Sequence, residues 1–211
     1  MTQFGVIVRA IVIACLASGA LAAPEYVDVT GVAPDDTLNV REAPNARAAD
    51  IGDLAPFAAG IEVIERDSSG KWGRIIWAEG NGWIAMRYTR PSPVAFIAGT
   101  GLPTGLVCAG TEPFWSLTLL EHGAFFGDLS GDYTSFSRNT AMIAAGHAHF
   151  PVALTLSTDT DFMLATLRPL QCSDGMSDRT YGWSVDVFGQ SANGQTLLSG
   201  CCRLPFDTGQ N

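Results

Sequence analysis

Four side chains in the first half of the chain have the chemistry to hold a ligand: Arg41, Trp72, Trp83 and Tyr88. Aromatic rings stack on sugars or peptides, and a guanidinium can hold a carboxylate through two parallel hydrogen bonds. The competing interpretation is that these rings form the core of a small domain, because buried aromatic side chains only pack. Trp77 lies an odd number of positions from Trp72, so on a regular strand the two rings face opposite sides and one of them is the better candidate for exposure.

The N-terminus has the pattern of a secretory signal peptide. Arg9 is the only charge before Glu25, residues 10–22 are largely apolar, and Ala20-Leu21-Ala22 forms an A-x-A cleavage site. Residues 1–22 are therefore expected to be removed, leaving a periplasmic or secreted protein with no transmembrane segment. The alternative is a lipoprotein, because the residues that end in Cys15 loosely resemble a lipobox.

The remaining four cysteines all lie in the second half of the chain, at Cys108, Cys172, Cys201 and Cys202. An even number in an exported chain predicts two disulfides, which can form in three ways. A bond between the neighbours Cys201 and Cys202 would be strained. Adjacent strand residues point to opposite faces, so one of the two is expected to bond Cys108 and the other Cys172. The alternative is one structural bridge and two free thiols. Zinc is not indicated, because the chain has no C-x-x-C pair.

Other chemical groups in the chain indicate structure more than catalysis. His147 and His149 would share a strand face as a metal pair does, but no third ligand lies near them in sequence. The loop around Asp174 is expected to hydrogen-bond its own backbone, with Arg179 as a counter-charge. Glu112 is interpreted as a buried structural acid, with a general acid as the alternative. No hydrolase, metalloprotease, phosphate-loop or dinucleotide motif is present, so we expect no enzyme activity, no metal and no cofactor.

The elements that position the first group are short apolar strands separated by turn residues, between residues 38 and 89. The order of landmarks resembles the bacterial-type Src homology 3 domain. The residues that carry the resemblance are Leu38-Asn39-Val40-Arg41-Glu42-Ala43-Pro44, Trp72, Gly82-Trp83-Ile84 and Tyr88. It implies a small barrel over residues 25–90 that binds cell-wall or protein ligands.

Residues 91–105 are rich in proline and glycine and are predicted to form a linker. In residues 106–206, Val152, Leu154 and Leu156 alternate with small or polar residues, and Asn193-Gly194 indicates a hairpin turn. This half is expected to be a second antiparallel β-barrel or sandwich of about six to eight strands, with a short helix over residues 141–148 as one option. The fold class is therefore all-β.

The second half carries its own resemblance. Its motifs are C-A-G-T-E-P-F-W at residues 108–115, C-S-D-G-M-S-D-R-T-Y at residues 172–181, and Gly200-Cys201 near the end. They look like a family of small bacterial envelope domains with no assigned reaction. The resemblance implies an extracytoplasmic β-domain and no catalysis.

The net charge is -9, and loss of the leader makes it more negative because the leader carries only Arg9. An acidic surface repels phosphate backbones, so nucleic acid is not an expected partner. We expect an exported cell-envelope binding protein that recognises peptidoglycan or a wall-associated peptide or protein. The alternatives are an inhibitor or accessory protein of an envelope enzyme, and a non-catalytic part of a wall hydrolase system.

Overall fold

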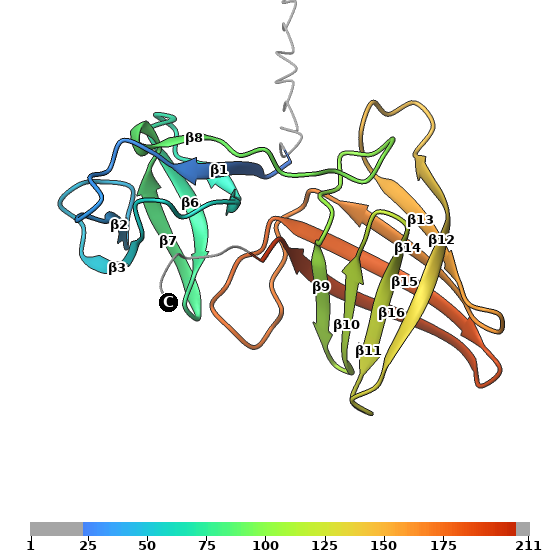
Figure 1. Cartoon of the computed structure of the whole chain (residues 1–211). Coiled ribbons are helices and arrows are strands. Elements are labelled where there is room, and N and C mark those ends of the chain that lie inside the picture. Colours follow the sequence, from blue (N-terminus) through green and yellow to red (C-terminus); the bar gives the residue numbers. More distant parts are fainter. Residues whose placement is uncertain (1–22, 206–211) are drawn as a thin grey trace, which may run out of the picture.

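The computed structural model describes residues 23–205, so the predicted signal peptide and the lipidation alternative at Cys15 lie outside the described residues. The described chain forms sixteen β-strands and one short 3-10 helix, with no α-helix. Within that range, no helix has the length and apolar character needed to cross a membrane. The expected all-β class is confirmed, and Figure 1 shows two β units joined by an extended connection.

The first unit contains two antiparallel sheets. One has the order β4-β1-β8 and the other has the order β3-β2-β7-β6-β5. The elements are β1 (Glu25–Val29), β2 (Leu38–Arg41), β3 (Asp50–Leu54), β4 (Ile61–Val63), β5 (Glu65–Arg66), β6 (Trp72–Trp77), β7 (Gly80–Ala85), the 3-10 helix η1 (Met86–Tyr88) and β8 (Thr89–Pro91). Side chains alternate along these strands, so Val40, Ile75 and Ile84 are fully buried in the core between the sheets.

The second unit is a closed barrel of eight antiparallel strands in chain order, with β9 pairing both β10 and β16. Its strands are β9 (Val107–Thr111), β10 (Phe114–Leu119), β11 (Gly123–Asp128), β12 (Tyr133–Ile143), β13 (Val152–Ser157), β14 (Phe162–Arg168), β15 (Trp183–Ser191) and β16 (Gly194–Arg203). The alternating residues Val152, Leu154 and Leu156 point inward and are buried, as predicted. The predicted hairpin forms between β15 and β16, with Ser191 opposite Gly194.

The two ends of this barrel differ. One end, which we call the closed end because the connection between the units fills it, carries this connection and the β10–β11, β12–β13 and β14–β15 loops (Figure 1). Ile97 and Leu102 of that connection are fully buried in the barrel core, and the Phe150 ring packs edge-on against Trp183. The open end carries the other four turns. The predicted linker is therefore structured and plugs this end, because its Ile97 and Leu102 side chains bury their surface inside the barrel.

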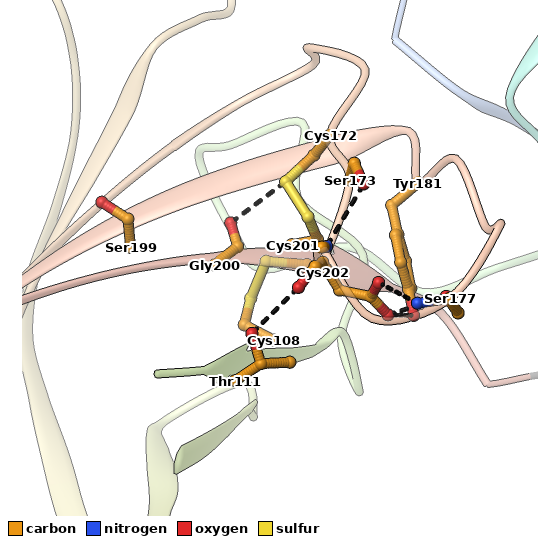
Figure 2. Close-up of a disulfide and its surroundings, with 12 residues drawn as sticks. Cys108, Thr111, Cys172, Ser173, Ser177, Tyr181, Ser199, Gly200, Cys201 and Cys202 are labelled. Atoms are coloured by element: carbon orange, nitrogen blue, oxygen red, sulfur yellow. Dashed lines mark hydrogen bonds between the residues drawn. A yellow bond between two sulfur atoms is a disulfide. The ribbon is translucent and has the colours of Figure 1, made fainter. Parts of the chain in front are cut away.

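One disulfide joins β9 and β16, the strands that close the barrel, and the other joins the β14–β15 loop to β16. Cys108 bonds Cys202, and Cys172 bonds Cys201 (Figure 2). The prediction that the two adjacent cysteines bond different partners, Cys108 and Cys172, is therefore confirmed. Cys202 points into the barrel core, whereas Cys201 faces outward into a separate cluster with Ile76 of the first unit. The outward disulfide therefore lies in the interface between the two units.

A buried carboxyl group lies in the same interface. Glu62 of β4 accepts a hydrogen bond from the Leu204 backbone N–H at 2.9 Å. Tyr26 lies between the units, because its hydroxyl donates to Glu62 at 3.5 Å and accepts from the Trp183 indole at 3.0 Å. Burial raises the pKa of Glu62 to about 7. This side chain is only 3% exposed, so the carboxyl group is buried where the two units meet.

The optional helix over residues 141–148 is not formed. Ala141 and Ile143 continue β12 and pair with Leu154 and Val152 of β13, and a turn follows. Alanine favours helices, but a stretch this short gains more from pairing with a neighbouring strand than from its own propensity.

Candidate functional site

Three side chains form a row across the outer face of the first unit's larger sheet. Trp83 of β7 lies directly opposite Arg41 of β2 on one side and opposite Arg74 of β6 on the other. Residues paired across antiparallel strands share a face, so the indole is flanked by two guanidinium groups. We call these residues the Arg-Trp-Arg row. The sequence identified Arg41 and Trp83, but their adjacency depends on the strand pairing.

Trp72 lies on the same face as this row. It pairs with Ala85, which is two positions from Trp83 along β7, so the two indoles are diagonal neighbours. Both rings are half-buried, whereas Ile75 and Ile84 on the opposite face are fully buried. The outer face therefore presents two aromatic rings beside two cationic groups.

Both arginines in the row already have acidic neighbours. Arg41 lies 3.6 Å from Asp50 and donates to the Ala48 carbonyl at 3.3 Å, and both contacts use Nη1. Arg74 pairs with Glu65 at 3.0 Å. The two arginine side chains are 23% and 25% exposed, respectively. Among the described residues, the Nη2 atom of Arg41 contacts no polar group. This nitrogen is therefore available to a ligand carboxylate.

The other two aromatic candidates lie elsewhere. The indole of Trp77 donates to the Ile51 carbonyl at 3.0 Å, and the ring packs over Gly52 and against the core. This position agrees with the expectation that Trp72 and Trp77 face opposite ways. Tyr88 belongs to η1, not to the sheet, and packs against the same core with the Arg87 guanidinium 4.5 Å from its ring centroid. The structure therefore does not bring Tyr88 into the Arg-Trp-Arg row.

The second unit covers the remainder of the same face through its β14–β15 loop. Asn81 of β7 donates to the Thr180 carbonyl at 3.0 Å and accepts from the Thr180 N–H at 2.7 Å. Arg74 also donates to the Thr180 hydroxyl at 2.9 Å. One residue of the Arg-Trp-Arg row is therefore held by the second unit, and the open part of the site lies beside the interface.

Sequence reasoning missed Arg74 and the interface. The signal for Arg74 was present, because it lies two positions after Trp72 on a strand and must share its face. No such signal exists for Thr180, which is about a hundred positions away in the chain and meets the sheet only through tertiary packing.

The loop around Asp174 is held by its own hydrogen bonds, as expected. Its carboxylate accepts from the Ser177 backbone N–H at 2.9 Å and from the Tyr181 hydroxyl at 2.9 Å. Burial alone would raise its pKa, but these bonds and others from the same loop outweigh burial and lower the pKa to about 2. Arg179 is not its counter-charge, since it pairs with Glu79 of the first unit at 2.9 Å.

The remaining predicted groups make no catalytic cluster. Glu112 is exposed in the β9–β10 turn, so the interpretation as a buried acid is wrong. The turn is short and lies at the barrel end, where nothing covers the side chain. His147 and His149 lie in the β12–β13 loop, outside any strand. Across residues 23–205, no three His, Cys, Asp or Glu side chains gather as a metal site would require.

Comparison with known proteins finds no family model, no curated protein and no solved structure that matches this chain.

Proposed function

We propose that this is an exported cell-envelope binding protein that recognises peptidoglycan or a wall-associated peptide through the outer face of its first unit. Peptidoglycan combines sugar rings with peptide carboxylates. Such a ligand matches a surface with indole rings for stacking and guanidinium groups for carboxylates. The two disulfides support export, because such bonds persist in oxidising compartments.

The observation that carries the proposal is the Arg-Trp-Arg row itself. An isolated indole on a sheet surface is common and needs no function. Here Trp83 lies between Arg41 and Arg74, with Trp72 on the same face. Arg74 is held by Glu65 and Thr180, so the groups open to a ligand on this patch are the two indoles and Arg41. The anionic groups of the ligand would be held by Arg41, whose Nη1 faces Asp50 and the Ala48 carbonyl and whose Nη2 is open to a carboxylate.

A sedimentation assay with purified, insoluble peptidoglycan tests this proposal. The mature protein should pellet with the wall material, and Trp83→Ala should reduce the apparent affinity about tenfold, the effect of losing one aromatic contact of roughly 1.4 kcal/mol. Phe57→Ala is the matched control, because Phe57 is an aromatic residue of the same unit that is 74% exposed and lies outside the row. Equal binding by the native protein and a correctly folded Trp83→Ala variant would overturn the assignment of the site.

The same assay separates the proposal from its main alternative, an inhibitor or accessory protein of an envelope enzyme. That alternative is favoured by the interface, where the β14–β15 loop of the disulfide-stapled unit borders the row through Thr180. An accessory protein of this kind would bind an enzyme through surfaces of both units and would not pellet with bare peptidoglycan.

A further inference from the structure

We propose that the open end of the eight-stranded barrel is a second binding site, and that it takes a small organic cation with an apolar body and an amino group. This site is separate from the wall-binding face. It belongs to the other unit and lies at the barrel end away from the interface (Figure 1).

A cavity of about 460 Å³ occupies this end. Sites for small organic ligands have volumes of roughly 300 to 1,000 Å³ and often lie at the mouths of β-barrels. A barrel of about eight strands can either fill its interior with side chains or leave room for one small ligand. This barrel does both, because its closed end is filled and its open end is not.

The hollow arises at a level of the barrel where one inward-facing position is a glycine. Met163, Gly189 and Thr196 are paired across β14, β15 and β16, so all three face the interior at one level. One step deeper, Val187 is fully buried and fills the barrel. At Gly189 a Cβ would meet only one atom within 4 Å, the Thr196 methyl at 3.0 Å. The glycine therefore opens the space that the cavity occupies.

The walls of the cavity are apolar on the opposite side. Phe126 and Phe136 point inward from β11 and β12, and Phe126 is held by stacking on Trp115 at 6.3 Å between ring centroids. Together with Met163 they offer a surface for the apolar body of a ligand, and its burial there is favourable.

The rim of the cavity is acidic and has no counter-charge. Asp128, Asp132 and Asp161 line it, and none of the ion pairs formed within residues 23–205 involves any of them. Hydrogen bonds from Ser130 lower the pKa of Asp128, which keeps this carboxylate charged.

The cations of the barrel lie at its other end. Arg138 and Arg168 pair with Glu121 and Asp186, and Arg203 ends β16 at the closed end. An amine entering the open end would therefore meet negative charge at the rim and apolar surface inside. The same acidic rim would repel a ligand that carries a carboxylate.

Calorimetric titration of the mature protein with phenylbutylamine tests the proposal, with phenylbutyrate and phenylbutanol as probes of the same shape. The amine should bind at least tenfold more tightly than the alcohol, and the carboxylate should give no measurable binding. No binding of the amine, or equal binding of the amine and the carboxylate, would overturn the proposal.

Two kinds of variant locate the site. Gly189→Val should fill the cavity and abolish binding of the amine. The double variant Asp128→Asn with Asp161→Asn should weaken binding of the amine at least tenfold without changing the strands. It therefore tests the same claim if the valine variant fails to fold. Asp159→Asn is the control, because Asp159 lies in the same turn as Asp161 but does not line the cavity. Unchanged affinity in the paired variant would contradict the site. Peptidoglycan binding should be unaffected throughout.

Discussion

The two ends of the eight-stranded barrel belong to the same strands but differ in what fills them. At the closed end, Ile97 and Leu102 fill the interior, both disulfides tie neighbouring segments, and the first unit packs against the outside. At the open end, Gly189 leaves space and the acidic rim has no cationic partner among the described residues. The difference indicates that stability and the packing of the two units depend on the closed end, and it leaves the open end for the proposed binding of an amine.

The largest expected effect is loss of the inward disulfide. Replacing Cys108 and Cys202 by alanine frees two strands that lie 94 positions apart in the chain, so the free energy of unfolding of the barrel should fall by about 4.7 kcal/mol in the chain-entropy model. Removing the outward bond, which spans 29 positions, should cost about 3.6 kcal/mol. Urea denaturation measures both. A larger loss from the outward pair would reverse the ranking that the loop lengths predict.

The plug should rank next. Leu102 is fully buried in the barrel core although it belongs to the connection between the units. Leu102→Ala should therefore lower the free energy of unfolding by about 2 to 5 kcal/mol, as for other core leucines. A loss below about 1 kcal/mol would mean that the connection lies on the surface, as a simple linker would, and the contrast between the two ends would weaken.

The interface should make stability depend on pH. Glu62 has a native pKa of about 7 against an ordinary value of 4.5, so the folded protein favours its neutral form. The contribution of Glu62 to the free energy of unfolding is therefore fully present below pH 4.5. It is lost as the pH rises through 7, and the total loss is about 3 kcal/mol.

Glu62→Gln is always neutral and should lose this dependence. Denaturation series from pH 4 to pH 8, covering the two pKa values of Glu62, should converge for the two proteins at the acid end and diverge at the alkaline end, with the glutamine variant the more stable. Parallel curves for the two proteins would contradict the buried, neutral carboxyl group.

The smallest effect is expected at the open end. Asp161→Asn removes a charge that lines a cavity and belongs to no ion pair in the described structure, so the free energy of unfolding should change by less than about 0.5 kcal/mol, as thermal denaturation can measure. A substantial loss of stability would assign this carboxylate a structural role and would remove the distinction between the two barrel ends.

The sequence predicted the features that depend on local alternation. The strand pattern at Val152, Leu154 and Leu156 predicted an inward-facing row, and the two faces of a strand predicted that Cys201 and Cys202 take different partners. These expectations are confirmed because a period of two is set by the backbone itself and needs no knowledge of the partner strand.

Features that depend on distant partners could not be predicted in this way. The connection between the units was expected to be a simple linker because of its glycines and prolines, yet Ile97 and Leu102 enter the barrel. Arg179 was paired in sequence with a nearby aspartate but reaches Glu79 of the other unit. In both cases tertiary packing decides which of several compatible local interactions forms.

Only part of the candidate site could be predicted, because its geometry also depends on tertiary packing. Trp83 and Arg41 were identified by residue type, whereas their position side by side, and the presence of Arg74 on the other flank, follow from strand pairing. Tyr88 was selected by type as well, but its place in η1 against the core separates it from the row.

The central claim is that the outer face carrying Trp72 and Trp83 binds the cell wall. The most direct test is a titration of isotope-labelled mature protein with a soluble peptidoglycan fragment, followed through the indole N–H resonances. The five tryptophans include Trp77 and Trp183, whose indoles donate to Ile51 and Tyr26 and serve as internal references. We expect saturable shifts of the Trp72 and Trp83 signals with the references unchanged. Absence of any shift, or shifts confined to the reference signals, would contradict the proposed function.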